Sequence, residues 1–184
     1  DLLKIKLKNS IGLNSKLKFF GQLIIAAIAL FILIEFSDHE YLYNLYFPFF
    51  KNLIWQMGLF FIPFGLFVII GSSNAVNLTD GLDGLATVPV MLVALSFTLI
   101  SYVVGNTIFS EYLQLQYIPD VGELSIFCGS IVGSCLGFLW YNAPPAKIFM
   151  GDTGSLSLGG SLAAVAIIAK HEIVLSIVGG LFVL

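Results

Sequence analysis

Three short polar segments interrupt an otherwise apolar chain, and their side chains are of types that handle phosphates and metal ions. Residues 1–8 pair an acid with several Lys, residues 74–84 hold two Asn and two Asp, and residues 142–155 place Asp152 among glycines. Carboxylate and amide oxygens suit a hard cation such as Mg²⁺, with phosphate groups completing its shell. Phosphoryl transfer needs mainly positioning and charge neutralisation, so this inventory favours that chemistry.

Each segment also has a simpler explanation. Lys residues beside a membrane bind anionic headgroups, although helical spacing would bring Asp1, Lys4 and Lys8 to one face. A helix cap needs one Asp or Asn, and residues 74–84 supply four. A turn that re-enters the membrane would use the Pro and Gly of residues 142–155, but it would not require Asp152.

The composition indicates a multi-spanning membrane protein. Of the 184 residues, 58% are apolar and only 10% are charged, against about a quarter charged in an ordinary soluble domain. The mean hydropathy of +0.99 agrees. These values exclude a soluble globular domain, a disordered chain and a disulfide scaffold.

An all-α bundle follows from runs that lack charged residues, because a spanning helix needs about 20 mostly apolar residues. We predict five complete spans and a truncated sixth in a single domain over residues 1–184: 17–36, 53–71, 85–105, 124–141, 156–169 and 173–184. The aromatic connector at 37–51 is typical of a membrane–water boundary. The ends of the chain, at Asp1 and Leu184, predict an internal fragment of a longer protein.

The span count places the three polar segments on one side of the membrane, since two spans separate each segment from the next. That side carries most of the Lys residues: Lys4, Lys6, Lys8, Lys16, Lys18 and Lys147. The Lys bias predicts that this side is cytoplasmic. Because the segments adjoin spans, one substrate of such a site would be a lipid.

Two patterns in the fourth span predict packing. Cys128 and Cys135 lack the spacing of a redox or zinc motif and are expected to be small buried side chains. Gly129, Gly133 and Gly137 lie four residues apart, so we expect another helix to approach closely there.

Two longer motifs resemble the polyprenyl-phosphate sugar-phosphate transferase superfamily. They are NLTDGLDGLA at 77–86 and FMGDTGSLSLGG at 149–160, and DLLK at 1–4 resembles the second half of the family's Asp-Asp-x-x-Lys motif. The resemblance extends over essentially all 184 residues in order and spacing. The motifs favour the branch that transfers phospho-N-acetylmuramoyl-pentapeptide over the branch that transfers N-acetylglucosamine phosphate.

The resemblance implies an Mg²⁺-dependent phosphotransferase of the bacterial inner membrane, with its active site on the cytoplasmic face. Undecaprenyl phosphate would attack the sugar-linked phosphate of UDP-MurNAc-pentapeptide, and UMP would leave. The product would be the first lipid intermediate of peptidoglycan synthesis. Expected partners are therefore the two substrates and the lipid bilayer, with no nucleic acid; a homodimer stays open.

The resemblance also implies roles for individual residues. Asp152 would be the metal ligand, and Asp1 would be one of two paired acids, acting either as a base or as a positioning group. Gly81, Leu82 and Asp83 would meet uracil, with Phe149 stacking on it. The implied catalytic set is Asp1, Asp80, Asp83 and Asp152, and the implied substrate-binding set is Lys4, Lys8, Lys16, Asn77, Gly81, Leu82, Asp83, Asn142 and Phe149.

The sequence departs from the family pattern at its two ends, residues 1 and 184. The first Asp of the pair would precede residue 1, and a His-rich loop would follow residue 184, so we expect the 184 residues alone to be inactive. Two alternatives from other classes stay open, an ion-coupled transporter with broken helices and a structural membrane subunit. A transporter would hold its polar groups near the bilayer midplane, whereas these acids cluster at one edge.

Overall fold

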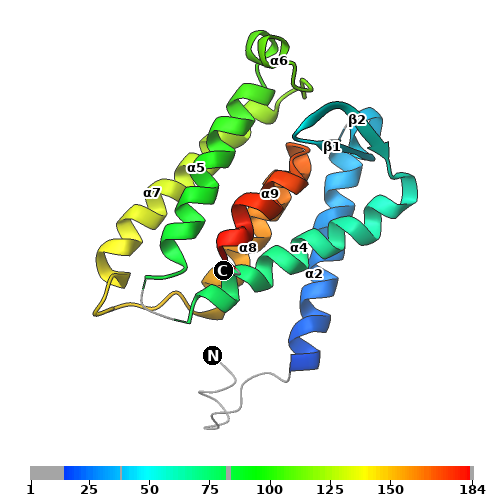
Figure 1. The fold of residues 1–184 in the computed structure, drawn as a ribbon. Coiled ribbons are helices and arrows are strands. Elements are labelled where there is room, and N and C mark those ends of the chain that lie inside the picture. The colour runs from blue at the N-terminus through cyan, green and yellow to red at the C-terminus, as the bar shows by residue number, and fades with distance from the viewer. Residues whose placement is uncertain (1–14, 38, 82–83, 183–184) are drawn as a thin grey trace.

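A computed structural model describes residues 15–37, 39–81 and 84–182, and five long helices dominate it (Figure 1). All five are long and apolar enough to cross a membrane. This confirms an all-α, multi-pass bundle with five spans. The helices are α2 (Ser15–Phe36), α4 (Phe61–Thr79), α5 (Thr87–Val104), α7 (Leu124–Asn142) and α8 (Gly151–Ile168).

Shorter elements join these helices. An antiparallel hairpin pairs Asn44 with Gln56 and Tyr46 with Ile54. After α8 the chain turns back into a short helix and a 3₁₀ turn, where the sequence predicts a sixth span at 173–184. The short elements are α3 (His39–Leu42), β1 (Asn44–Phe47), β2 (Phe50–Gln56), η1 (Gly58–Phe60), α6 (Thr107–Leu113), η2 (Val121–Glu123), α9 (Glu172–Val178) and η3 (Gly179–Phe182).

The predicted bounds of the second span, 53–71, are wrong at both ends. Residues 53–56 belong to β2, because an aromatic and β-branched run pairs well across a hairpin. The helix α4 then continues to Thr79, so Asn74 and Asn77 lie in a helix instead of a loop. A helix tolerates these polar side chains in a membrane because neighbouring groups satisfy their hydrogen bonds.

The predicted start of the fifth span, residue 156, is also wrong. The helix α8 begins at Gly151, which has a φ of 67° that favours glycine. Asp152 and Ser155 therefore lie in the first turns of a helix. This start places Asp152 near the positive end of the helix dipole, where a carboxylate is favoured.

The five spans alternate in direction along the bundle (Figure 1). The start of α2, the α4–α5 connection and the α7–α8 connection lie at one end of the bundle, called the site end below. The hairpin, α6 and the α8–α9 turn lie at the opposite end. The polar segments at 74–84 and 142–155 thus share one end, as the span count predicts.

A close contact of α4 with α8 forms one half of the core. A Cβ atom on Gly159 would lie 2.5 Å from the Ser72 carbonyl oxygen and 2.7 Å from the Ser73 Cα. Two hydroxyls cross the same contact: Ser72 Oγ donates to the Gly159 carbonyl at 2.9 Å, and Ser73 Oγ donates to the Leu156 carbonyl at 2.7 Å. Small residues of this kind let helix backbones approach closely in membranes.

The α5–α7 pair forms the other half, with Val93, Ala94 and Phe97 buried in one cluster with Cys128 and Cys135. Both cysteines are free and buried, as predicted. The prediction for Gly129, Gly133 and Gly137 is wrong within the described part of the chain, where no other element comes within 4 Å of their Cβ positions. The close glycine contact of this fold lies on α8 at Gly159 instead.

We predict that Gly159→Ala destabilises the bundle, whereas Gly160→Ala, its neighbour with no atom within 4 Å of the Cβ position, does not. The added methyl at residue 159 must push α4 away from α8, and overpacking of this kind typically costs about 1–3 kcal/mol. Thermal unfolding of the full-length protein in detergent measures the difference. Equal midpoints for the two variants would contradict the close-contact assignment.

We also predict that the two ends of the bundle label from opposite sides of the membrane. A membrane-impermeant thiol reagent added to intact cells should label Tyr112→Cys, which lies at the opposite end and is exposed, and should leave Ala146→Cys unlabelled. Permeabilised cells provide the control, because both sites should then react. Labelling of Ala146→Cys in intact cells would reverse the assigned orientation.

Candidate functional site

Four side chains from three helices meet at the site end. Lys18 Nζ on α2 donates to Asp152 Oδ2 at 3.0 Å and to Asn77 Oδ1 at 3.1 Å. Asn77 Nδ2 on α4 donates to Asp152 Oδ1 at 3.0 Å and to Ser155 Oγ at 2.8 Å. Ser155 in turn donates to the Gly151 carbonyl at 3.0 Å. Asp152 therefore has one oxygen facing an ammonium and the other facing an amide.

A second acid adjoins this network at the end of α4. Asp80 is the residue that follows the helix, and its backbone N–H donates to the Val76 carbonyl at 3.2 Å. Partial burial raises the pKa of the Asp80 carboxyl, the Gly151 N–H hydrogen bond to the carboxylate lowers that pKa, and the charge of Asp152 raises it. The net direction is upward, so an additional cation beside Asp80 would relieve a charge that its surroundings disfavour.

The Lys18–Asp152 ion pair lies at the surface of the site end. The Asp152 side chain is 68% exposed and that of Lys18 is 31% exposed. Exposed ion pairs contribute about 0–1 kcal/mol to stability. This ion pair is therefore accessible from solvent and adds little to the stability of the fold.

These residues fit a magnesium ion of the kind that phosphoryl-transfer enzymes use. Such an ion keeps several waters and takes one or two protein carboxylates plus substrate phosphates. Asp152 and Asp80 supply that number of carboxylates at the site end. The described residues contain no group of three His, Cys, Asp or Glu side chains that would form an all-protein cage.

Of the residues implied by the family resemblance, Asn77, Asp80 and Asp152 meet in this arrangement. Asn142 does not join them. It is buried, accepts from Thr87 Oγ1 at 2.7 Å and donates to the Ile148 carbonyl at 3.0 Å. Its side chain thus ties the start of α5 to the α7–α8 connection, instead of lining the polar site.

The remaining implied residues lie around the site or outside the described chain. Gly81 is exposed just after α4, Lys16 is exposed in the first turn of α2, and Phe149 is 70% exposed in the α7–α8 connection. Five implied residues lie outside the described residues: Asp1, Lys4, Lys8, Leu82 and Asp83.

Sequence reasoning missed Lys18 and Ser155 as members of the site. Lys18 lies inside the predicted span 17–36, and an ionisable residue within a span is by default a functional candidate. That signal could have identified it. Ser155 carried no such signal, since its role depends on α8 starting at Gly151.

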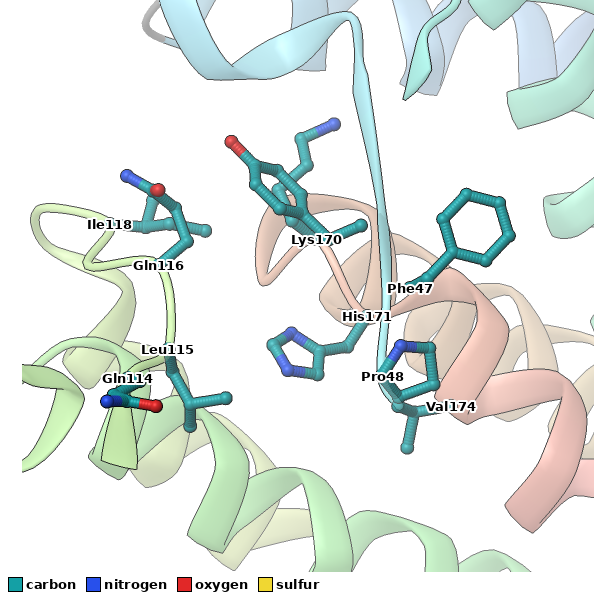
Figure 2. Close-up of a pocket in the computed structure, with 10 residues that line it drawn as sticks. Phe47, Pro48, Gln114, Leu115, Gln116, Ile118, Lys170, His171 and Val174 are labelled. Carbon is teal, nitrogen blue, oxygen red and sulfur yellow. The ribbon is translucent and has the colours of Figure 1, made fainter. Parts of the chain in front are cut away.

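The opposite end of the bundle holds a different polar cluster (Figure 2). His171, Gln114 and Gln116 line a pocket there, between the hairpin, the α6–η2 connection and the α8–α9 turn. Lys170 donates to the Leu42 carbonyl, lies over the Phe61 ring at 4.4 Å, and is 3.6 Å from Glu172 Oε1. Both charged side chains are buried, at 4% and 1% exposure, so this pair is part of the core of the fold.

Fold and site together define a helical, multi-pass membrane protein that carries a cation-neutralised acidic site at one end of its bundle. The family model for glycosyl transferase family 4 matches residues 6–170, and the chain belongs to this family.

Curated relatives agree over the whole chain. The chain is 66% identical over 184 residues to a phospho-N-acetylmuramoyl-pentapeptide-transferase of Pelagibacter ubique. It is 58% identical over 184 residues to the protein of the same name from Rickettsia prowazekii, and 60% identical to that from Rickettsia bellii. All of the chain is covered in each case, and it spans about half (51%) of the length of these relatives.

We predict that Asp80→Asn stabilises the chelator-treated, full-length protein at pH 7.5. The pKa of Asp80 is raised in the fold, so the stability that the protonated acid contributes at low pH is lost as pH rises through that pKa. Asn keeps the acceptor for the Gly151 N–H without the charge. Thermal unfolding against pH should show a gain near neutrality that disappears in acid; a gain that is the same at every pH would contradict the assignment.

Proposed function

We propose that this chain forms part of a phosphotransferase that moves phospho-N-acetylmuramoyl-pentapeptide from its UDP-linked donor to undecaprenyl phosphate. The observation that carries the proposal is the meeting of Asp152, Asp80, Asn77 and Lys18 at the site end, beside the helices that face lipid. The names of the relatives supply the donor sugar. The product would be the first lipid intermediate of peptidoglycan, which serves cell wall biogenesis, cell shape and division.

The reaction joins the two substrates through one phosphorus atom. A phosphate oxygen of the lipid attacks the phosphorus that bears the sugar, the bond from that phosphorus to the bridging oxygen of UMP breaks, and UMP leaves with the electron pair. A phosphate monoester has its second pKa near about 6, so the lipid phosphate is mostly dianionic at neutral pH. The attacking group therefore needs to be held in place more than it needs to be deprotonated.

The residues of this chain would provide that placement. The Lys18 ammonium is shared between Asn77 and Asp152 and would neutralise an incoming phosphate. Asp152 and Asp80 would hold Mg²⁺, which would offset the negative charge of the diphosphate as it approaches. The amide of Asn77 holds the Asp152 carboxylate, and the hydroxyl of Ser155 accepts from the same amide and helps to orient it.

The location follows from the same features. The Lys bias favours a cytoplasmic site end, and nucleotide-linked sugars are available there. The bilayer delivers the lipid substrate laterally to the same edge. An ion-coupled transporter would hold acids near the bilayer midplane, whereas Asp80 and Asp152 lie at helix ends.

We predict that Asp152→Asn, in the full-length enzyme, lowers transfer at limiting Mg²⁺ by at least about a hundredfold, because removing one electrostatic group of this kind costs that much. UMP release with both substrates measures the rate, and circular dichroism checks the fold. Asp120→Asn is the matched control, since Asp120 is exposed at the opposite end. A near-normal rate for Asp152→Asn would reassign Asp152 to a helix-capping role.

The donor sugar is decided by competition in the same assay. Equal amounts of UDP-MurNAc-pentapeptide and UDP-N-acetylglucosamine should yield almost only the muramoyl product. Preferred use of UDP-N-acetylglucosamine would transfer the proposal to the other branch of the superfamily.

We predict that Phe149→Ala raises the KM for the nucleotide donor by about tenfold, since base stacking on an aromatic ring is worth about 1–3 kcal/mol. Phe149→Trp should be milder because it keeps a stacking surface. Phe67→Ala is the matched control, as Phe67 is 74% exposed against 70% for Phe149 but lies within the span α4. If Phe149→Ala leaves the donor KM unchanged, the stacking role is wrong.

A further inference from the structure

The helix α2 carries Lys18 to the site, yet few apolar contacts hold it. Ala26 and Leu30 are its buried side chains in the described chain, and large apolar residues such as Ile25 and Phe31 are mostly exposed. Lipid tails solvate such residues as well as a neighbouring helix does, so apolar contact alone does not select one register of α2 against α4. Specific contacts must do so.

One such contact is a pair of side-chain amides within the apolar spans. Gln22 Nε2 donates to Asn74 Oδ1 at 3.2 Å, and Asn74 Nδ2 donates to Gln22 Oε1 at 3.0 Å. Asn74 Nδ2 also donates to the Ile70 carbonyl at 2.8 Å. A backbone carbonyl only accepts, so this third hydrogen bond fixes which way round the Asn74 amide lies.

The amide pair lies next to the site along both helices. Gln22 follows Lys18 by four residues and Asn74 precedes Asn77 by three, so each pair of residues shares a helix face. Farther from the site, Leu30 packs against Gly65, whose Cβ position would lie 2.9 Å from Leu30 Cδ1. Gln22 and Asn74 thus lie between the Leu30–Gly65 contact and the hydrogen bonds of Lys18.

We propose that Gln22 and Asn74 are positioning residues for the transfer reaction: their amide pair sets the register of α2 on α4 so that Lys18 reaches Asn77 and Asp152. A slip by one residue moves a helix by about 1.5 Å along its axis and turns it by about 100°. The effect on the rate of transfer rests on the proposed function, whereas the register of α2 on α4 is independent of it.

The register is tested by a distance that does not depend on activity. Spin labels at Phe19→Cys and Leu78→Cys, both exposed sites, report the α2–α4 separation by electron–electron double resonance in the full-length protein with every native cysteine, Cys128 and Cys135 included, changed to Ser. Asn74→Leu should shift or broaden the distance distribution. The exchange Gln22→Asn with Asn74→Gln restores the summed side-chain length and should restore the distribution. An unchanged distribution in Asn74→Leu overturns the inference.

The positioning role is tested by kinetics in the same protein. A misplacement of about 1 Å lowers rates by up to about a hundredfold, so Asn74→Leu should lower kcat by ten- to a hundredfold with little change in the donor KM. The exchange variant should recover most of this loss. Ser130→Leu is the control, because Ser130 is exposed on α7 and its hydroxyl bonds within its own helix, to the Ile126 carbonyl.

The decisive comparison uses Lys18→Met as background. If Asn74 acts through Lys18, Asn74→Leu adds no further loss of kcat to Lys18→Met. Losses that add, or a shifted distance with an unchanged kcat, overturn the positioning role. If the full-length protein shows no transfer at all, the proposed function fails, and the spin-label distances still decide whether the amide pair sets the register.

Discussion

The backbone contact of α4 with α8 at Gly159 is the constraint on which the rest of the site depends. With no side chain at that residue, the two helices approach until Ser72 and Ser73 donate directly to carbonyls of α8. Asn77 lies one turn farther along α4 and Ser155 one turn earlier on α8, and their side chains then meet at 2.8 Å. A wider separation of the helices would break that hydrogen bond and the bond from Asn77 to Asp152.

The two ends of the bundle use ion pairs in opposite ways. Lys170 and Glu172 are buried, and Lys170 is further bound by a carbonyl and an aromatic ring, so its partners are fixed by the fold. Asp152 is exposed to solvent and Lys18 is partly exposed, and their pairing contributes little to stability. The proposed exchange of substrates requires the second kind of pair, because buried charges exchange partners at high cost.

Polar side chains inside the spans serve the helix contacts and do not mark the ends of helices. Asn74 bonds to Gln22 and to its own helix, and Asn77 bonds to α8. In lipid an unsatisfied amide is costly, so these groups are stable only when their partners are present. The polar residues of α4 therefore lie where α2 and α8 pack against it. From the sequence of α4 alone, the same residues are predicted to lie outside the span.

Composition and charge by themselves determined that this is a multi-spanning helical protein, because bilayer thickness and the cost of charge in lipid act on any chain. Alternation of spans likewise determined that Asp80 and Asp152 share one end, and their motifs pointed to the family. Only the tertiary structure decided that α4 runs to Thr79 and α8 starts at Gly151, that Asn142 serves a connection, and that Lys18 reaches Asp152. The physical reason is that these outcomes depend on hydrogen bonds and close backbone contacts between helices 50 or more residues apart in sequence, and such contacts leave no periodic pattern within a single helix.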